Sequence, residues 1–522
     1  MRWALCASLA ALSIAAGAAS LEQLVAENFH VRVRLGEVQR EQVFQPTGLC
    51  FLINRNGEIT TRVAADTELT VESVGLEPAP VRWRILLGIY APLNKPAARA
   101  LAAQVARELN FPAELIEREG LGDEEGQLWV TLGLFETREE AFGYLQGVLP
   151  LVPRAQLWRD DRERQIARLR VHDRRGREIA ELWEQVTLVP VDDTAEIGVR
   201  VRGESRHFRG QMICRADERG RILLINDVHV DDYLMSVVAQ EIGDAPPAAL
   251  RAQAITARSE AFFKVNSVHH RDPLYDLCDT THCQAYRGVE AETAESRRAV
   301  RATRGLVLMW GDEICDAVYS HNCGGVTAPM EDVWHSAGHP YAEGRLDTLE
   351  SEEAPDLSSA GAIWSFLSDP PPVMGNPDRA PGFPHYAERY FRWTWRVSAE
   401  ALAAEVEEEF GVDLGRIRGV TVTDRARSGR VRSLRLEGSE GALELHLSTE
   451  IRRLSGILST LFVVDPIEGA DSELESIRFF GGGWGHGVGM CQMGAYMRGR
   501  AGQTHQEILH AYFPRAEIRR VY

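Results

Sequence analysis

The sequence predicts an α+β fold: a β-rich main domain with helices, plus a small ferredoxin-like insert of order βαββαβ. Short apolar stretches of period two dominate residues 30–75 and return after residue 157. Between them, residues 79–155 alternate strand-like and helix-like segments. The chain has 522 residues, 44% of them hydrophobic and 26% charged, so it is globular and long enough for about three compact units.

The N-terminal end resembles a secretory signal. Arg2 precedes an apolar run to about Ala16, and Ala16-Gly17-Ala18 resembles a cleavage site. The run is shorter than the roughly 20 apolar residues of a membrane-spanning helix, which favours cleavage over an uncleaved anchor. We therefore expect a signal peptide at 1–19 and an exported mature protein without membrane insertion.

The elements expected after the signal follow in order. Residues 21–78 form a β-rich segment, with strands such as VRVRL and CFLIN and a turn at Asn56-Gly57. In the insert, WRILLGIY and LWVTLGLF alternate as strands, whereas AARALAAQVAREL and REEAFGYLQGVL have helical spacing. The main domain, 156–522, opens with hairpins at Arg175-Gly176 and Arg219-Gly220.

Later segments of the main domain complete this outline. A helix is predicted to enter at Pro246 and Pro247 and to continue to Phe263 with an apolar packing stripe. Residues 351–385 are rich in Pro, Ser, Asp and Gly, and we expect a long surface loop there. Strands resume at FRWTWRV.

The charge balance excludes one class of partner. There are 76 acidic and 58 basic residues, which gives a formal net charge of -18. Sequence-independent binding of nucleic acid needs clustered Lys and Arg, so we expect no nucleic-acid partner. The charge does not exclude a sugar polymer as a partner, because proteins bind saccharides by hydrogen bonds and aromatic stacking, which need no net charge.

A single carboxylate stands out at Glu241. It ends the apolar run YLMSVVAQ and precedes a break at Gly243. A carboxyl group against apolar neighbours tends to keep its proton and can then act as a general acid. From the residues alone, an ordinary helix-end glutamate is the favoured interpretation.

A cluster of cysteine and histidine residues predicts a metal site. Cys278, His282 and Cys283 lie within six residues, and His270 is the fourth candidate for a tetrahedral zinc site. A Cys278–Cys283 disulfide or free thiols are the alternatives, and His269 competes with His270. Four protein ligands leave no position for water, so we expect a structural metal. The chain has no H-E-x-x-H motif, which weakens a zinc hydrolase.

Three stretches in a fixed order carry a family resemblance. They are the Asp227–Phe263 segment with Glu241 and ALRAQAITARS, THCQAYRGVEAET with AVYSHNCGGVT, and GGGWGHGVGMCQMGAY. Together they resemble the stage II sporulation protein D family, which includes amidase-enhancer proteins, over roughly residues 157–522. The resemblance implies a lytic transglycosylase that cleaves peptidoglycan glycan strands, with peptide-free strands as an open option. Its essential glutamate aligns with Glu241, and some members bind zinc through this Cys/His cluster.

This chemistry needs only one carboxylate. Glycosidases that use water normally need two carboxyl groups. In a lytic transglycosylase, the C6 hydroxyl of the sugar attacks the anomeric carbon and closes a 1,6-anhydro ring. Glu241 would protonate the leaving oxygen and then take the proton of that hydroxyl. The resemblance also implies a secreted, periplasmic or cell-wall location.

Seven further residues are predicted to bind the glycan. In the glycine-rich segment, Trp484 would stack on a sugar ring, and His486 and Gln492 would hydrogen-bond its hydroxyls; tight packing of these side chains is the alternative. The other predicted substrate-binding residues are Gln253, Arg258, Gln284 and Tyr286. The chain departs from the family at Glu260, where an aromatic residue is common, and at Cys491, which is often Ser and so is not a required nucleophile. Cys323 could pair with Cys315.

The insert resembles sporulation-related repeat domains, which bind peptide-free glycan. Such a module would raise the effective concentration of the enzyme on the polymer. A plain packing module is the alternative. For the whole chain, the rival hypothesis is a non-catalytic peptidoglycan-binding activator of a cell-wall amidase, in which Glu241 is only structural.

Overall fold

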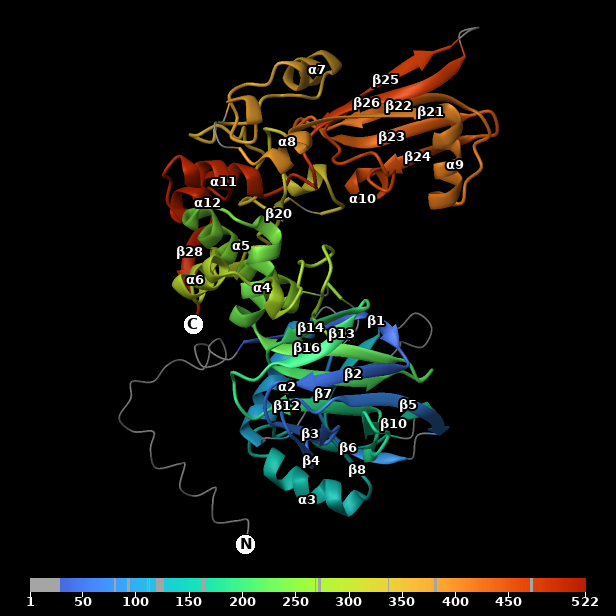
Figure 1. The fold of residues 1–522 in the computed structure, drawn as a ribbon, viewed down its shortest axis with the longest axis vertical. Helices are drawn as coiled ribbons and strands as arrows, with labels where there is room; N and C mark the ends of the chain where they lie inside the picture. The colour runs from blue at the N-terminus through green and yellow to red at the C-terminus, as the bar shows by residue number, and fades with distance from the viewer. Residues whose placement is uncertain are drawn as a thin grey trace.

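The computed structural model describes residues 29–522, except 79–80, 92–93, 110, 112, 119–125, 161–164, 268, 271–273, 337, 380–382 and 470–472. It has 27% helix and 39% strand, which confirms the α+β class. Figure 1 shows a β-rich part formed by the first half of the chain, a central group of helices, and a further sheet-containing part coloured orange. The predicted signal peptide lies outside the described residues.

Two large sheets form the β-rich part. Their strand orders are β17-β1-β16-β15-β12-β3-β4 and β11-β10-β5-β2-β13-β14. The N-terminal strands β1, β2 and β5 therefore lie between strands that follow the insert, whereas β3 and β4 form one edge of the first sheet. One hydrophobic core includes side chains from both sheets and from the central helices. The strands are β1 (His30–Gln39), β2 (Glu41–Pro46), β3 (Cys50–Asn54), β4 (Ile59–Val63), β5 (Leu69–Pro78), β10 (Gln165–Asp173), β11 (Glu178–Trp183), β12 (Gln185–Pro190), β13 (Ile197–Val201), β14 (Glu204–Phe208), β15 (Gln211–Ala216), β16 (Ile222–His229) and β17 (Leu277–Cys278).

The two hairpin predictions in this part are confirmed. Gly176 lies in the turn between β10 and β11, and Gly220 lies in the turn between β15 and β16. Both have positive φ values, 76° and 70°, which glycine adopts without steric cost. The turns therefore fix the registers of these two hairpins.

The insert is a four-stranded sheet with two helices. Its elements are β6 (Arg82–Tyr90), α2 (Lys95–Leu109), β7 (Ala113–Arg118), β8 (Gln127–Phe135), α3 (Arg138–Val148) and β9 (Gln156–Asp160). The strand order is β7-β8-β6-β9, and every neighbouring pair is antiparallel. The sheet and the helices share a separate hydrophobic core. The last strand, β9, lies wholly beyond residue 155, the predicted end of the insert, and pairs with β6 of the insert sheet.

Buried charges join the insert to the large sheets. Arg84 of β6 is fully buried and pairs with Asp160 at 2.7 Å and with Glu114 at 3.0 Å. Glu114 also pairs with Arg55, which follows β3, at 2.5 Å, and Arg55 pairs with Glu184. Breaking a buried ion pair costs several kcal/mol, so this network holds the insert against the main domain.

The central helices surround α5 (Pro247–Asn266), which contacts α4, α6, α11 and α12 and also touches α2 of the insert. α5 begins at Pro247, as predicted, because proline suits the first helical position. α4 (Val230–Ile242) has Asp231 and Asp232 in its first turn, where carboxylates favour the helix dipole. The other elements of this part are η2 (Val289–Ala291), α6 (Ala294–Ala302), β18 (Leu306–Trp310), β19 (Glu313–Ile314), β20 (Tyr319–Ser320), β27 (Met490–Cys491), α11 (Gln492–Arg500), α12 (His505–Tyr512) and β28 (Glu517–Arg520).

The remaining part contains two three-stranded sheets, β21-β26-β25 and β22-β23-β24, over a core of its own. Its elements are η3 (Met330–Asp332), α7 (Ala360–Ser368), η4 (Pro377–Arg379), α8 (His385–Phe391), β21 (Arg392–Ser398), α9 (Ala399–Phe410), β22 (Ile417–Arg425), β23 (Val431–Gly438), β24 (Ala442–His446), α10 (Leu447–Ile451), β25 (Phe462–Glu468) and β26 (Leu474–Gly482). None of the helices in the described part of the chain has the length and apolarity needed to cross a membrane.

The expectation of a loop over residues 351–385 is wrong in part, because α7 lies within it. Ser359 caps the start of this helix by accepting a hydrogen bond from the N–H of Ala362. Ile363, Phe366 and Leu367 are buried in a small core with β25. Three apolar side chains at helical spacing therefore outweigh the polar composition of the surrounding segment.

Candidate active site

Glu241 lies in the last turn of α4, at a half-buried position. Its Oε1 accepts a hydrogen bond from the N–H of Ala285 at 2.8 Å, and its Oε2 faces Nε2 of Gln492 at 3.4 Å. Neither of these partners carries a charge. The carboxyl group is therefore held in place by one strong and one weak neutral hydrogen bond.

Burial raises the pKa of Glu241 above its usual range. Desolvation is the largest cause, because it disfavours the charged form, and the nearby carboxylate of Glu260 acts in the same direction. The hydrogen bonds from Ala285 and Gln492 and the charge of Lys264 oppose this shift. A carboxyl group of this kind can hold a proton that an ordinary surface glutamate would lose.

Gln284 and Glu260 form a buried network behind Glu241. Glu260 pairs with Lys264 at 2.6 Å, one helical turn along α5, and accepts a hydrogen bond from Nε2 of Gln284 at 2.9 Å. Oε1 of Gln284 accepts from the hydroxyl of Tyr233 at 3.0 Å. The extra carboxylate of Glu260 is thus paired with Lys264. Both the oxygen and the nitrogen of the Gln284 amide have hydrogen-bond partners within the protein.

Two other predicted substrate-binding residues are also buried and bound to protein. Arg258 is fully buried, and its Nε and Nη2 donate to Oδ1 of Asp231 at 3.1 and 2.8 Å. The hydroxyl of Tyr286 donates to Oδ1 of Asn226 at 2.8 Å, and its ring packs on Tyr233 at 4.9 Å. In this conformation both side chains support the helices and the sheet, and their contact with a substrate stays a prediction.

Gln492 and Gln253 lie beside the carboxyl group of Glu241. Nε2 of Gln492 is 3.5 Å from Oε1 of Gln253, in addition to its contact with Glu241. Nε2 of Gln253 is buried and has no hydrogen-bond partner among the described residues. A buried unpaired donor indicates a missing ligand or water in well-packed proteins. Of the two, Gln492 contacts the carboxyl group directly, and Gln253 is reached through Gln492.

His486 and Trp484 have different environments although only Gly485 separates them. Nε2 of His486 donates to the carbonyl of Tyr319 at 2.7 Å, and its Nδ1 accepts from the N–H of Val488 at 3.1 Å. Desolvation lowers the pKa of His486 to about 3, so the ring is neutral and both nitrogens are occupied by backbone. Trp484, by contrast, is 37% exposed and can contact a ligand.

The sequence did not identify two tyrosines that pack near Trp484. The ring of Tyr390 stacks on Trp484 with centroids 4.2 Å apart, and Tyr386 lies one turn earlier on α8. His321 contacts all three rings. We call these four residues the aromatic patch. The spacing of four between the tyrosines is the only signal in the sequence, and the segment begins inside the expected loop.

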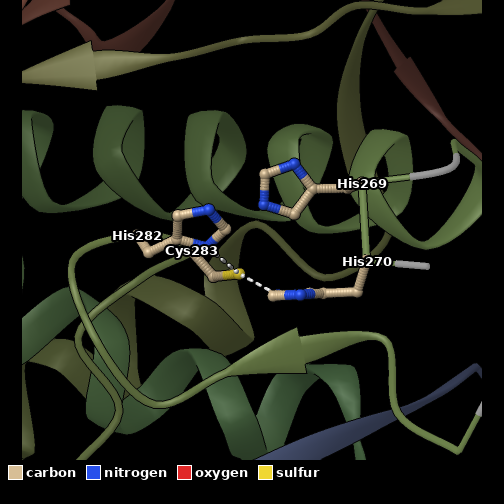
Figure 2. A group of neighbouring side chains, drawn as sticks. All are labelled: His269, His270, His282 and Cys283. Atoms are coloured by element: carbon tan, nitrogen blue, oxygen red, sulfur yellow. Dashed lines mark hydrogen bonds between the residues drawn. The ribbon is translucent and has the colours of Figure 1, made fainter. Parts of the chain in front are cut away.

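The predicted metal ligands come together beside this site. Sγ of Cys278 is 3.5 Å from Sγ of Cys283, and Nδ1 of His282 is 3.7 Å from each sulfur. Nε2 of His270 is 3.1 Å from Sγ of Cys283. Figure 2 shows the rings of His269, His270 and His282 gathered around Cys283. Both cysteines are free thiols, so the alternative of a disulfide between them does not hold in this structure.

These separations fit a tetrahedral zinc site. Bonds of about 2.0–2.3 Å to nitrogen and sulfur place neighbouring ligand atoms of a tetrahedron roughly 3.3–3.8 Å apart. Three of the four distances above lie in this range, and the His270 contact is slightly shorter. His269 has a buried Nε2 without a hydrogen-bond partner among the described residues, and it also belongs to the group that could hold an ion. The choice between His269 and His270 therefore stays open.

The cysteine and histidine cluster is connected to Glu241 through a short stretch of backbone. Lys264 of α5 donates from Nζ to the carbonyls of Cys283 at 3.1 Å and His282 at 3.4 Å. Ala285, whose N–H holds Glu241, follows Cys283 by two residues. Any group that fixes Cys283 also fixes the hydrogen-bond donor of the carboxyl group.

The cysteine of the SHNCGG stretch does not pair with Cys315. All seven cysteines of the described chain are free. The backbone N–H of Cys323 donates to Sγ of Cys491 at 3.3 Å, and Sγ of Cys323 lies 3.4 Å from Oδ2 of Asp347. Asp347 forms a fully buried ion pair with Arg498. Cys491 thus lies inside the protein.

Comparison with known families agrees with the motif analysis. Residues 218–310 match the family model of the stage II sporulation protein, and they contain Glu241 and all the predicted metal ligands. Residues 328–489 match a domain of unknown function, DUF8618. Residues 218–310 thus carry a domain similar to the stage II sporulation protein family, and the chain is similar to stage II sporulation protein D and to the amidase enhancer.

Three relatives share this similarity. An uncharacterized protein of Brachyspira hyodysenteriae is 24% identical over 298 residues, which cover 57% of this chain and 68% of that protein. The amidase enhancer of Bacillus subtilis is 24% identical over 285 residues, 51% of this chain and 37% of the relative. Stage II sporulation protein D of Bacillus subtilis is 24% identical over 314 residues, 56% of this chain and 75% of the relative. The chain thus spans little more than a third of the amidase enhancer.

Proposed function

We propose that the protein is a peptidoglycan lytic transglycosylase with Glu241 as its general acid and base. The observation that carries this proposal is the state of the carboxyl group. It is half-buried, has a raised pKa, and is oriented by the N–H of Ala285 and the amide of Gln492. The match to the stage II sporulation protein domain and the similarity to stage II sporulation protein D support a role at the cell wall.

The reaction follows from one carboxyl group that changes its protonation state. Glu241 donates its proton to the glycosidic oxygen as the bond to the anomeric carbon breaks. The C6 hydroxyl of the same sugar attacks that carbon, and the Glu241 carboxylate takes its proton. Because the attacking hydroxyl belongs to the substrate, the step needs no bound water and gains the entropic advantage of an intramolecular reaction. The enzyme ends the cycle with Glu241 protonated again.

A non-catalytic activator of a cell-wall amidase is the second candidate. The named amidase enhancer among the relatives favours it. In that case Glu241 would stabilise the Ala285 loop and would have no role in bond cleavage.

The two candidates differ in what the purified protein does alone. We expect release of 1,6-anhydromuramyl products from glycan strands without any amidase. We also expect Glu241→Gln to lose this release while it still binds the strands. Absence of glycan cleavage, together with a faster amidase when the protein is added, would support the activator instead.

We further propose that Cys278, His282, Cys283 and one of His269 or His270 hold a structural zinc ion. The ligand distances and the chemistry of the donor set support this assignment. Zinc would supply cross-linking of the loop and no bond-breaking chemistry, because four protein ligands close its coordination shell. The Cys283 backbone would in turn hold the Ala285 N–H in position to donate its hydrogen bond to Glu241.

The insert is proposed to be a ferredoxin-like module of the sporulation-related repeat kind that binds glycan. The antiparallel order β7-β8-β6-β9 with two helices supports this proposal. On the sheet, Trp129 and Trp158 pack with ring centroids 5.0 Å apart, and Arg118 lies 4.5 Å from the Trp129 ring. Because the Arg84 network holds the insert to the main domain, such a module would present glycan from a fixed position.

Export is the last part of the proposal. The N-terminal sequence supports a cleaved signal peptide at 1–19, and an enzyme of peptidoglycan must reach the periplasm or the cell wall. N-terminal sequencing of the protein from the wall fraction tests this; an intact Met1 would contradict it.

A further inference from the structure

The aromatic patch is built from three segments far apart in the sequence. Tyr386 and Tyr390 come from α8, His321 follows β20, and Trp484 follows β26. The Tyr390 and Trp484 rings are nearly parallel at 24°, and the His321 ring is 4.9 Å from Trp484 and 5.1 Å from Tyr390. The fold therefore brings these rings to one place.

The patch faces outward, although large aromatic rings are usually buried. Tyr386 is 58% exposed and Trp484 is 37% exposed. α8 is anchored by Ala387 and Phe391, which are buried in two different cores. One side of this short helix thus holds it to the protein while the two tyrosines, four residues apart, project from another. Exposed clusters of this kind mark binding surfaces.

α11 connects the patch to the carboxyl group of Glu241. Gln492, the first residue of α11, contacts Oε2 of Glu241, and the N–H of the next residue, Met493, donates to the carbonyl of His321 at 3.1 Å. Desolvation raises the pKa of Tyr386, and Tyr496 on α11 and Asp244, just past Glu241, lie close enough to act in the same direction. The patch therefore borders the turn that carries the candidate acid.

The chemistry of the patch suits a sugar that carries a negative charge. A pyranose ring has an apolar face of C–H groups that packs on aromatic rings, and tyrosine and tryptophan also supply a polar group at the edge. Arg389 is exposed at the rim, with its guanidinium 4.7 Å from the Tyr390 ring and Nη2 donating to the Tyr390 hydroxyl. An exposed guanidinium recognises a carboxylate in a planar, paired geometry. Nε2 of His321 is buried in the patch without a partner among the described residues and could bind a hydroxyl.

We propose that the aromatic patch with Arg389 is a saccharide subsite that binds an acidic pyranose unit of the glycan next to Glu241. The proposal rests on the proposed function of Glu241 for its role in cleavage, but the binding itself can be measured separately. It assigns a role to α8, which lies within the domain of unknown function and outside the matched sporulation-protein domain.

The test compares binding of two probes by full-length variants. The probes are a neutral N-acetylglucosamine oligomer and a peptide-free glycan strand, whose muramyl units carry a carboxylate. We expect Tyr386→Ala with Tyr390→Ala to weaken both affinities by about tenfold or more, measured by calorimetry. Tyr386→Phe with Tyr390→Phe keeps the rings and should stay within about threefold of the unaltered protein. Arg389→Gln should weaken binding of the acidic strand only.

The control is Trp310→Ala, which removes a ring that is 42% exposed on β18. If the double alanine variant binds both probes as tightly as this control, with an unchanged melting temperature, the proposal is overturned. An Arg389→Gln variant with unaltered affinity for the acidic strand would overturn the choice of an acidic sugar. Loss of amidase stimulation with intact glycan binding would instead make the patch a protein-docking surface and overturn the proposal.

Failure of the proposed function gives a different result. If Glu241→Gln still releases product, Glu241 is not the acid, but weaker glycan binding by the double alanine variant would still support the subsite. If cleavage depends on Glu241 while the patch variants keep their glycan affinity and their KM for cleavage, the proposed function is supported and the subsite proposal is wrong.

Discussion

The end of α4 carries a half-buried glutamate and the middle of α5 a buried one, and their environments are opposite. Glu260 on α5 has a cation, Lys264, at 2.6 Å and a hydrogen bond from Gln284. Glu241 on α4 has only the Ala285 N–H and the Gln492 amide. The same side chain thus faces a cation in one place, whereas in the other desolvation raises its pKa. Environment, and not residue type, separates a structural from a catalytic carboxyl group.

The largest expected effect is on the rate of glycan cleavage. Glu241→Gln removes the transferable proton and keeps the shape, so we expect product release to fall by about 10²–10⁴-fold. Glu260→Gln should retain activity, because its side chain does not reach the reacting oxygen. Liquid chromatography with mass spectrometry of released fragments measures both. Equal losses in the two variants would contradict the distinction between the glutamates.

Loss of the proposed metal should act on the fold that holds Glu241. Cys283→Ser removes a ligand, and we expect the free energy of unfolding to fall by more than about 4 kcal/mol, because the binding energy of a structural metal is part of the folding energy. Chelation of the unaltered protein should lower its melting temperature in calorimetry. Chelation that stops turnover with an unchanged melting temperature would favour a catalytic metal.

The two glutamate variants should rank the opposite way in stability: Glu260→Gln, which keeps its activity, should lose the more stability. Glu260→Gln leaves Lys264 buried without its ion partner and should cost roughly 3 kcal/mol in chemical denaturation. Glu241→Gln should not destabilise the protein at neutral pH. The folded-state pKa of Glu241 is raised, so the native protein is penalised once pH rises above the ordinary glutamate pKa, and the neutral amide avoids that penalty. A Glu241→Gln variant less stable than Glu260→Gln would refute this comparison.

The smallest expected effect is on the pH dependence of cleavage. The acid must be protonated, so the rate should fall as pH rises through the raised pKa of Glu241. Glu260→Gln removes a nearby negative charge and should move this alkaline limb to lower pH. Gln492→Met removes a hydrogen bond to the carboxylate and should move it to higher pH. Shifts of the same sign in both variants would show that another group controls the limb.

Local patterns in the sequence predicted the parts of the site that are close together along the chain. Cys278, His282 and Cys283 lie within six residues, so their spacing alone indicated a common site, and the structure brings them within ligand distance. The turn glycines and the start of α5 at Pro247 were predictable for the same reason. Each depends on neighbouring residues only.

Directions of side chains and long-range contacts were not predictable. Arg258 and Tyr286 lie in family motifs, but a motif does not tell which way a side chain points, and both are buried in protein contacts. α5 is buried on nearly all sides, so its apolar stripe could not indicate a free face. The contact of Tyr390 with Trp484 joins segments that no local pattern connects.

The central claim is that one carboxyl group and the substrate's own hydroxyl cleave the glycan. The most direct test is cleavage of glycan strands in water labelled with a heavy oxygen isotope. We predict 1,6-anhydromuramyl ends that contain no label and that disappear with Glu241→Gln. Reducing ends that carry the label, or unlabelled anhydro ends that persist in the Glu241→Gln variant, would contradict the account.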